Sequence, residues 1–268
     1  MHPYLLRFTN PVTGAAGGVT TYALCLFLGA GVAIALTGWL GRRRGLPGFD
    51  LLAVGLLALV GGLAGAKVFY LLLNGPEVVA RFGWRALLSG GGYVWYGGLL
   101  GGVVAVLLYA RAYGLPKRVL ADLAAPGLAL GQAFGRVGCF SAGCCYGLPA
   151  PGSPLAVVFP PGAIAPPGIP RYPTQLFEAT GLVILAGILL VLLLRRRAWR
   201  DGAIFWIYLM SYAVLRYVVE IYRGDDRGPM FGPFSPSQVI ALGVLLGGGV
   251  VAGLALNRRR RVGAAARR

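Results

Sequence analysis

The sequence predicts an all-α, polytopic membrane protein with about seven transmembrane helices, built as a single integral-membrane domain over residues 1–268. The chain is 57% apolar and only 12% charged, which is too apolar for an ordinary soluble domain. It also contains seven apolar runs long enough to span a bilayer, which takes about 20 residues each. These runs lie near residues 20–40, 50–73, 92–112, 119–138, 174–194, 202–222 and 235–256.

The distribution of basic residues predicts the orientation of these spans, because cytoplasmic loops carry an excess of Lys and Arg. Sixteen of the twenty-five basic residues lie in one set of alternating connections: Arg42, Arg43, Arg44, Arg111, Lys117, Arg118, Arg195, Arg196, Arg197, Arg200, Arg258 to Arg261, Arg267 and Arg268. The opposite set holds six: Arg7, Arg81, Arg85, Arg171, Arg223 and Arg227. We therefore expect an outside N-terminus, a cytoplasmic C-terminus and a basic cytoplasmic tail at residues 257–268.

Composition also excludes several classes of function. The net charge of +17 is spread over short clusters between apolar runs, which suits topology signals and contacts with anionic lipids. We therefore expect no nucleic-acid partner. The one histidine, His2, lies at the extreme N-terminus, which excludes a histidine-based triad or metal site in the body of the chain. We expect no cofactor.

Six ionisable residues fall within or at the ends of the apolar runs. A charge at that depth costs about 2.5–3.5 kcal/mol on insertion scales, so such residues are usually paired, face the bundle interior and serve a function. A purely structural ion pair is the alternative for any one of them. The six residues are Lys67, Asp122, Arg136, Glu178, Arg216 and Glu220.

The most informative stretch is Gly135–Gly147, which holds an arginine, three of the four cysteines and four glycines in thirteen residues. It indicates an anion site at the end of an apolar run. Cys139, Cys144 and Cys145 are open to three interpretations, in this order: a disulfide or packing role, a nucleophile, and a metal site. The metal site ranks last because a C-x4-C-C spacing without histidine is a weak signal, and no metal is expected.

Two further segments carry candidate chemistry. Spacings of four and three residues place Arg216, Glu220 and Arg223 on one helical face, where Glu220 is suited to orient Arg216; an intrahelical salt bridge at the membrane surface is the alternative. Arginine is the residue suited to bidentate recognition of phosphate. Glycines surround Tyr96 in residues 90–102, where an interfacial aromatic belt is the alternative.

The remaining signals concern loops and helix starts. The proline-rich connection at about 139–172 is either a lid or an ordered cap. Pro173-Thr174-Gln175 and Pro236-Ser237-Gln238 are both typical of helix starts with proline in the first position, and Ser235 with Gln238 fits a capping box.

Taken together, these segments resemble the prolipoprotein diacylglyceryl transferase family. The pieces that carry the resemblance occur in the family's order: Gly65 to Tyr70, Gly91 to Gly101, Gly135 to Gly147, Tyr172 to Glu178, and Arg216-x-x-x-Glu220. The chain matches the family at Arg136, Gly147, Arg216 and Glu220, and Tyr22 looks like the family's tyrosine on the first helix. It departs at Tyr96, where the family usually has an essential histidine, at Cys139 for asparagine, at Cys144 for glutamate, and at Lys67 for arginine.

The resemblance implies a multi-pass enzyme of the bacterial plasma (inner) membrane. Such an enzyme moves the diacylglyceryl group of phosphatidylglycerol onto the lipobox cysteine of a prolipoprotein signal peptide. The products are a thioether-linked lipoprotein precursor and glycerol phosphate. The expected partners are phosphatidylglycerol, prolipoprotein signal peptides with a lipobox cysteine, and membrane lipids.

The resemblance, together with the chemistry, assigns roles to particular residues. Arg136 and Arg216 stabilise the departing phosphate. Glu220 accepts a proton or holds Arg216, and Tyr96 donates a hydrogen bond to a phosphate or carbonyl oxygen, because a phenol with a pKa near 10 is a poor base. The expected substrate-binding residues are Tyr22, Lys67, Gly97, Gly98, Cys139, Gly147, Gln175 and Glu178.

Two other functions stay open. The first is a paralogous membrane transferase that uses the same phospholipid donor with a different acceptor. It stays open because the chain differs from the family's usual residues at Tyr96, Cys139 and Cys144. A non-catalytic lipid transporter or binder is the second alternative. It is less favoured because the sequence has no paired inverted repeats or matched broken helices.

Overall fold

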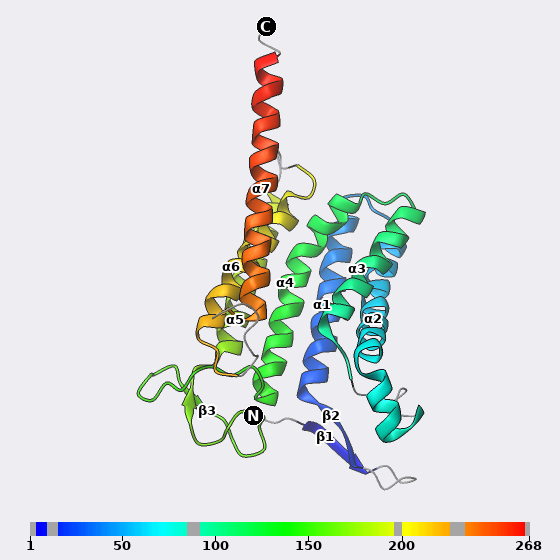
Figure 1. Ribbon diagram of the computed structural model, residues 1–268. Helices are drawn as coiled ribbons and strands as arrows, with labels where there is room; N and C mark the ends of the chain where they lie inside the picture. The colour runs from blue at the N-terminus through cyan, green and yellow to red at the C-terminus, as the bar shows by residue number, and fades with distance from the viewer. Residues whose placement is uncertain (1–3, 10–15, 85–91, 196–199, 226–233, 266–268) are drawn as a thin grey trace. The chain divides into compact units, whose positions relative to one another are not determined.

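The computed structural model describes residues 4–9, 16–84, 92–195, 200–225 and 234–265, and in these it contains seven helices (Figure 1). Each predicted apolar run corresponds to one helix. The helices are α1 (Thr21–Arg42), α2 (Gly48–Phe82), α3 (Trp95–Ala112), α4 (Lys117–Ala142), α5 (Thr174–Leu194), α6 (Ala203–Ile221) and α7 (Pro236–Ala265).

Within the described residues the structure also contains two small antiparallel sheets that the all-α prediction missed. Strand β1 (Tyr4–Thr9) pairs with β2 (Ala16–Thr20) before the first helix, and β3 (Val157–Val158) pairs with β4 (Pro170–Arg171) between α4 and α5. Neither pair has an alternating apolar pattern long enough to be seen in the sequence. Both are local hairpin-like pairings outside the apolar runs.

Most predicted helix bounds agree with the structure to within four residues, but two ends are wrong. Helix α2 continues nine residues past the predicted end at residue 73, through Pro76 to Phe82. The prediction stopped where the apolar run meets Asn74-Gly75-Pro76, yet the Asn74 side chain donates to the Tyr70 carbonyl oxygen at 3.2 Å. Pro76 has no N–H for the Leu72 carbonyl four residues earlier, so the helix continues past it with that one backbone bond missing. Helix α7 likewise continues to Ala265 instead of 256.

Five of the helices are long and apolar enough to cross a membrane: α1, α2 within Gly48–Ala80, α3, α5 and α6. At most 39% of the most apolar stretch of any of these helices is buried within the protein, as expected for lipid-facing surfaces. Helix α4 is not among them because charged and small residues lower its hydropathy, and α7 has a shorter apolar part, Pro236–Val250. The chain is therefore a multi-pass membrane protein, while the seven spans and their orientation stay predictions.

Part of the orientation argument falls on residues that the structure does not describe. Arg85, Arg196, Arg197, Arg227, Arg267 and Arg268 lie outside the described residues, as does the last part of the basic tail.

The chain forms two compact units, the large unit of Met1–Val32 and Ala125–Arg268 and the small unit of Ala33–Ala124. In the small unit, α2 and α3 pack through glycines. A Cβ added at Gly65 would lie 2.4 Å from the carbonyl oxygen of Gly97 and 2.9 Å from the Cα of Gly101. The two backbones thus touch directly, as small-residue helix crossings in membranes do. This explains the glycines that follow Tyr96 in the sequence, while Gly90 and Gly91 before it lie outside the described residues.

In the large unit, a glycine contact also joins α1 to α4. A Cβ added at Gly29 would lie 2.8 Å from the carbonyl oxygen of Gly131, and one at Gly138 would lie 3.2 Å from the Cα of Tyr22. Helix α5 packs against α6, and α6 packs against α7. The buried positions of α5 repeat at helical spacing, so Gln175 and Glu178 lie on the same inward face as Leu182 and Leu189.

Backbone hydrogen bonds tie the end of α4 to the start of α5 and the end of α6. The amide of Gly147 donates to the carbonyl of Tyr172, and Leu148 donates to Tyr222 at 2.8 Å. The Gly224 amide donates to the carbonyl of Tyr146. Gly147 is needed at this crossing, because a Cβ there would lie 2.5 Å from the Tyr172 oxygen and 2.9 Å from the Tyr222 oxygen. The crossing fixes three helix ends relative to one another within the large unit.

Candidate functional site

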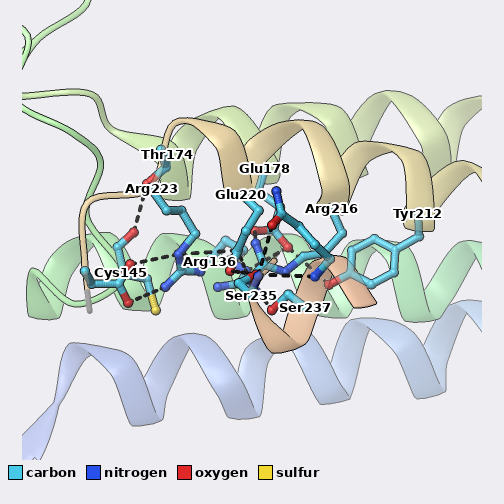
Figure 2. A network of polar contacts seen from close by, with 12 residues as sticks. Arg136, Cys145, Thr174, Glu178, Tyr212, Arg216, Glu220, Arg223, Ser235 and Ser237 are labelled. Atoms are coloured by element: carbon cyan, nitrogen blue, oxygen red, sulfur yellow. Dashed lines mark hydrogen bonds and ion pairs between the residues drawn. The ribbon is translucent and has the colours of Figure 1, made fainter. Parts of the chain in front are cut away.

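A buried carboxylate on α5 lies at the centre of the candidate site (Figure 2). The Glu178 side chain is 1% exposed, and its Oε1 lies 3.0 Å from Nε of Arg136 on α4. Its Oε2 lies 3.7 Å from Nη1 of Arg216 on α6. The Tyr212 hydroxyl donates to Glu178 Oε1 at 3.1 Å. One carboxylate therefore holds two arginines that lie 80 residues apart in the chain.

A second carboxylate, Glu220, pairs with the same arginine from within α6. Nη2 of Arg216 forms an ion pair with Oε2 of Glu220, and Nε of Arg223 lies 3.7 Å from that oxygen. The prediction that Arg216 and Glu220 share one helical face is confirmed, whereas Arg223 lies two residues past the end of α6 and reaches Glu220 from there. Arg223 also makes a bidentate pair with Asp225, at 2.8 and 2.6 Å. Such two-bond pairing fixes the plane of a guanidinium group.

The start of α7 completes the network with two serines that the sequence analysis treated only as helix-start signals. Ser235 and Gln238 form the predicted capping box: the Ser235 amide donates to the Gln238 side chain at 3.0 Å, and the Gln238 amide donates to Ser235 Oγ at 3.3 Å. The Ser235 hydroxyl also donates to Glu220 Oε1 at 2.7 Å. Ser237 Oγ accepts from Nη2 of Arg216 at 2.9 Å.

Sequence reasoning missed Tyr212, Ser235 and Ser237 as members of this network. Tyr212 lies four residues before Arg216, and this helical spacing is a signal that could have found it. The serines have no such signal, because only the packing of α7 on α6 brings them to the arginine. The resulting network combines three arginines with three carboxylates in a largely buried place. Removing a single partner there would leave an uncompensated buried charge.

The end of α4 forms a Schellman motif that brings two thiols together. Gly143 has φ +73°, its amide donates to the carbonyl of Phe140, and the Cys144 amide donates to the carbonyl of Cys139 at 3.1 Å. In this motif the side chains three residues before the cap and two after it come into contact. Those side chains are Cys139 and Cys144.

Cys145 follows with φ +60° and places a third thiol beside the first two. None of the four cysteines is joined in a disulfide, and Cys25 is the buried one on α1. Hydrogen bonds with the Cys139 and Cys144 thiols lower the pKa of Cys145, and the Arg223 guanidinium adds to this shift. The Cys145 sulfur therefore lies at the edge of the arginine network (Figure 2).

The start of α5 holds this turn in place. Thr174 Oγ1 donates to the Cys145 carbonyl at 2.8 Å, and Gln175 Nε2 donates to the Cys144 carbonyl at 2.6 Å. Gln175 was predicted to bind substrate; in the structure its amide binds the backbone of the turn. Pro173 precedes α5 as its cap residue instead of its first helical residue, whereas Pro236 is the first residue of α7 as predicted.

The profile of the prolipoprotein diacylglyceryl transferase family matches residues 12–254, which is most of the chain. The chain belongs to the prolipoprotein diacylglyceryl transferase family. The resemblance seen in the sequence is therefore confirmed.

Several relatives in this family carry names that state an activity. The chain is 34% identical over 239 residues to phosphatidylglycerol–prolipoprotein diacylglyceryl transferase 2 of Clostridium perfringens, covering 88% of this chain and 92% of the relative. It is 34% identical to the transferase of Clostridium tetani, over 82% of this chain and 87% of the relative. It is 36% identical to the transferase of Geobacter sulfurreducens, over 79% of this chain and 77% of the relative.

The large unit of this prolipoprotein diacylglyceryl transferase family member contains eight of the twelve predicted site residues. Arg136, Glu178, Arg216 and Glu220 meet in the network, and Gly147 lies at the backbone crossing. Cys139 and Gln175 belong to the turn after α4. Tyr22 is 41% exposed, and its backbone packs on Gly138.

The other four predicted residues belong to the small unit. Tyr96 is 50% exposed and packs edge-on against Trp95, with ring centroids 5.3 Å apart. Nζ of Lys67 lies 5.6 Å from the ring centroids of both Tyr70 and Tyr93, a cation–π arrangement. Gly97 and Gly98 pack against α2: a Cβ at Gly97 would meet the side chain of Phe69, and one at Gly98 would lie 3.3 Å from the Gly62 oxygen. Substrate contacts at these four residues stay predictions.

Proposed function

We propose that this protein is a phosphatidylglycerol–prolipoprotein diacylglyceryl transferase. The observation that carries the proposal is the pair of arginines, Arg136 and Arg216, that two helices present to one buried carboxylate, Glu178. Arginines kept at such depth are costly, so a function that needs buried positive charge accounts for them. Family membership supplies the donor and acceptor: the related enzymes are named for phosphatidylglycerol and prolipoprotein.

The two arginines are suited to different tasks. The Arg136 side chain is 20% exposed and the Arg216 side chain 9%, so Arg136 is the more accessible cation for an incoming phosphodiester. Nη1 of Arg216 is buried and has no hydrogen-bond partner among the described residues. Its nearest charged group is the Glu178 carboxylate at 3.7 Å, beyond hydrogen-bond distance, so an N–H of this nitrogen can donate to a phosphate oxygen. Two guanidinium groups held by a third group need little reorganisation when charge develops on the phosphate.

The reaction replaces one bond by another at a single carbon. The sulfur of the lipobox cysteine attacks the terminal glyceryl carbon of the diacylglyceryl group, and a carbon–sulfur bond forms. The bond from that carbon to the phosphate oxygen breaks, and glycerol phosphate leaves with both electrons. The thiol proton balances the charge on the released phosphate. The site contributes mainly by positioning the phosphodiester for in-line attack and by stabilising the departing phosphate.

The contacts of Glu220 favour a positioning role over that of a base. Its Oε1 accepts from Ser235, and its Oε2 forms the ion pair with Arg216. A carboxylate with both oxygens engaged is a poor acceptor for the thiol proton. Glu220 then orients the Arg216 guanidinium through Nη2, and Ser237 accepts a hydrogen bond from the same nitrogen. Tyr96 is proposed to donate a hydrogen bond to a lipid phosphate or carbonyl oxygen.

The proposal also places the reaction in the cell. Seven spans with an outside N-terminus put the α4–α5 connection, residues 143–173, on the outer side of a bacterial inner membrane. The arginine network then lies in the outer half of the bilayer. The acceptor is the lipobox cysteine of a prolipoprotein signal peptide, and other membrane lipids surround the site.

The test uses purified protein in detergent with phosphatidylglycerol and a lipobox peptide, followed by mass spectrometry of the peptide. A diacylglyceryl mass gain on the peptide cysteine is expected, and it should be lost in Arg136→Ala and Arg216→Ala. Arg111→Ala, at the exposed end of α3, is the matched control and should keep full activity. A family enzyme that modifies the peptide in the same mixture while this protein does not would contradict the proposal.

The unusual residues Cys139 and Cys144 in the Gly135–Gly147 stretch favour a second candidate, a transferase with the same donor and a different acceptor. Glycerol phosphate released from phosphatidylglycerol without modification of the lipobox peptide, but with modification of another thiol or hydroxyl compound, would select this candidate. A transporter would move lipid and modify no acceptor.

A further inference from the structure

The thiols of Cys139, Cys144 and Cys145 gather at the end of α4, and no step of the proposed transfer uses them as a group. Their three sulfur atoms all lie within 4.8 Å of one another. The fourth cysteine, Cys25 on α1, is not a member of this cluster. The question is which ligand three converging thiols at one helix end are suited to bind.

The backbone builds the cluster and holds it. The Schellman turn at Gly143 places the Cys144 side chain against that of Cys139. Cys145 has φ +60°, a conformation that residues other than glycine rarely adopt. The hydrogen bonds from Thr174 and Gln175 to the carbonyls of Cys145 and Cys144 keep the turn in this shape. The three sulfur atoms are therefore arranged by the fold and not by chance encounters of flexible side chains.

The spacing and chemistry of the sulfurs match a soft metal ion. A Zn–S bond is about 2.3 Å long, so two thiolates on one tetrahedral ion lie about 3.8 Å apart. Three sulfurs within 4.8 Å reach that geometry through small rotations of their side chains. Soft thiolate ligands select ions such as Zn²⁺ and Cu⁺ over Mg²⁺ or Ca²⁺.

The surroundings also suit a site rich in thiolate. The Arg223 side chain lies beside Cys145 and is itself fixed by two hydrogen bonds to Asp225 (Figure 2). Three thiolates around one divalent ion carry a net charge of −1, and the Arg223 guanidinium, although paired with Asp225, lies beside that charge. A neighbouring cation favours the thiolate form that a metal requires.

We propose that Cys139, Cys144 and Cys145 form a three-thiolate site for one thiophilic metal ion, of the class of Zn²⁺, whose fourth position is left to an exchangeable ligand. Each thiol releases its proton to the solvent as its sulfur binds the ion, so the step requires no oxidant or reductant. The ion then crosslinks the end of α4 to the turn that follows. The site is new relative to the proposed transfer reaction and does not depend on it.

The test uses Co²⁺ as a spectroscopic probe for the full-length protein in detergent, under argon and with a phosphine reductant. One equivalent of Co²⁺ should give the sulfur-to-cobalt charge-transfer bands of a three-thiolate site, and one equivalent of Zn²⁺ should displace it. Cys139→Ser, Cys144→Ser and Cys145→Ser should each weaken binding by at least about tenfold, since each removes a ligand. Cys25→Ser keeps all three ligands and should bind like the natural protein.

Three outcomes would overturn the proposal. The first is the absence of sulfur bands at one equivalent of Co²⁺, and the second is unchanged binding in Cys145→Ser. The third is a thiol count on metal-free, reductant-free protein that shows two of the three cysteines joined in a disulfide. Gel filtration and thermal melting of every variant separate loss of a ligand from loss of the fold. Because the readout is metal binding, a failed transferase assay leaves the result intact.

Discussion

The arginine network of the large unit and the α2–α3 contact of the small unit both arise from glycine-rich sequence, yet they work differently. At α2 and α3, glycines such as Gly65 and Gly97 bring two apolar backbones into direct contact. After α4, Gly143 and Gly147 instead let the chain turn and cross, and this delivers charged side chains to one place. Glycines therefore serve helix packing in one region and the construction of a polar site in the other.

The comparison also separates two sources of stability. The α2–α3 contact depends on shape, because lipid offers no hydrophobic drive for helices to associate. The network depends on balanced charge, since three arginines and three carboxylates offset the cost of burial. Substitutions that change shape should harm the first region, and substitutions that change charge should harm the second.

The largest effect should follow removal of the central carboxylate. Glu178→Gln leaves Arg136 and Arg216 without their shared partner and should lower the free energy of unfolding by about 3–5 kcal/mol. Thermal melting in detergent measures this loss. Glu77→Gln, at an exposed position on α2, should change stability by about 1 kcal/mol or less. Equal losses of unfolding free energy in Glu178→Gln and Glu77→Gln would contradict the view that balanced charge stabilises the network.

A somewhat smaller effect should follow from adding one methyl group at the helix contact. Gly65→Ala places a carbon against the backbone of Gly97 and Gly101, and the forced separation of α2 and α3 should cost about 1–3 kcal/mol. Gly38→Ala adds the same methyl where no atom lies within 4 Å, so it should be neutral or stabilising by up to about 1 kcal/mol. If Gly65→Ala and Gly38→Ala had the same melting temperature, the added methyl group would not disturb the contact between α2 and α3.

The helix end after α4 should be sensitive for a conformational reason. Gly143→Ala forces a Cβ onto a residue with φ +73°, which costs about 1–2 kcal/mol, and the new carbon would lie 2.7 Å from Cβ of Ala163. The turn should loosen and the thiols should separate. Gly135→Ala lies in the helical part of the same stretch with open space around it and is the matched control. Co²⁺ binding measures whether the thiols have separated, and thermal melting measures the stability lost when the turn loosens.

The smallest effect should come from the edge of the network. Ser237→Ala removes one hydrogen bond to Arg216 while Glu178 and Glu220 keep the guanidinium charge paired. We expect a loss of about 1 kcal/mol in stability, with a modest decrease in the rate of peptide modification. Ser141→Ala, which removes only an exposed bond within α4, should leave both unchanged. A complete loss of activity in Ser237→Ala would mean that this serine contacts the substrate.

The sequence predicted much of the site because local spacing governs part of it. The i, i+4 ion pair of Arg216 and Glu220 and the capping box of Ser235 and Gln238 both follow from the geometry of a single helix. The sequence did not predict that Glu178 would hold Arg136, or that Ser237 would reach Arg216. Those contacts join residues from α4, α5, α6 and α7, and no local pattern records which helix faces meet.

The cysteines show the same difference between what local spacing predicts and what the tertiary structure adds. The C-x4-C-C spacing is a weak metal signal by itself, because it does not reveal the conformation at Gly143 and Cys145. Two positive φ values and two side-chain bonds from α5 turn this spacing into a cluster of three sulfurs.

By itself the sequence determined the helices, their apolar character and the family, because these depend on composition, on local periodicity and on motifs along one stretch of chain. The tertiary structure alone decided which carboxylate holds which arginine, why glycines follow Tyr96, and that three thiols converge. These outcomes depend on helix packing, and packing is set by close contacts between side chains that lie far apart in the sequence. A sequence pattern identifies the residues of such a site but does not predict their contacts with one another in space.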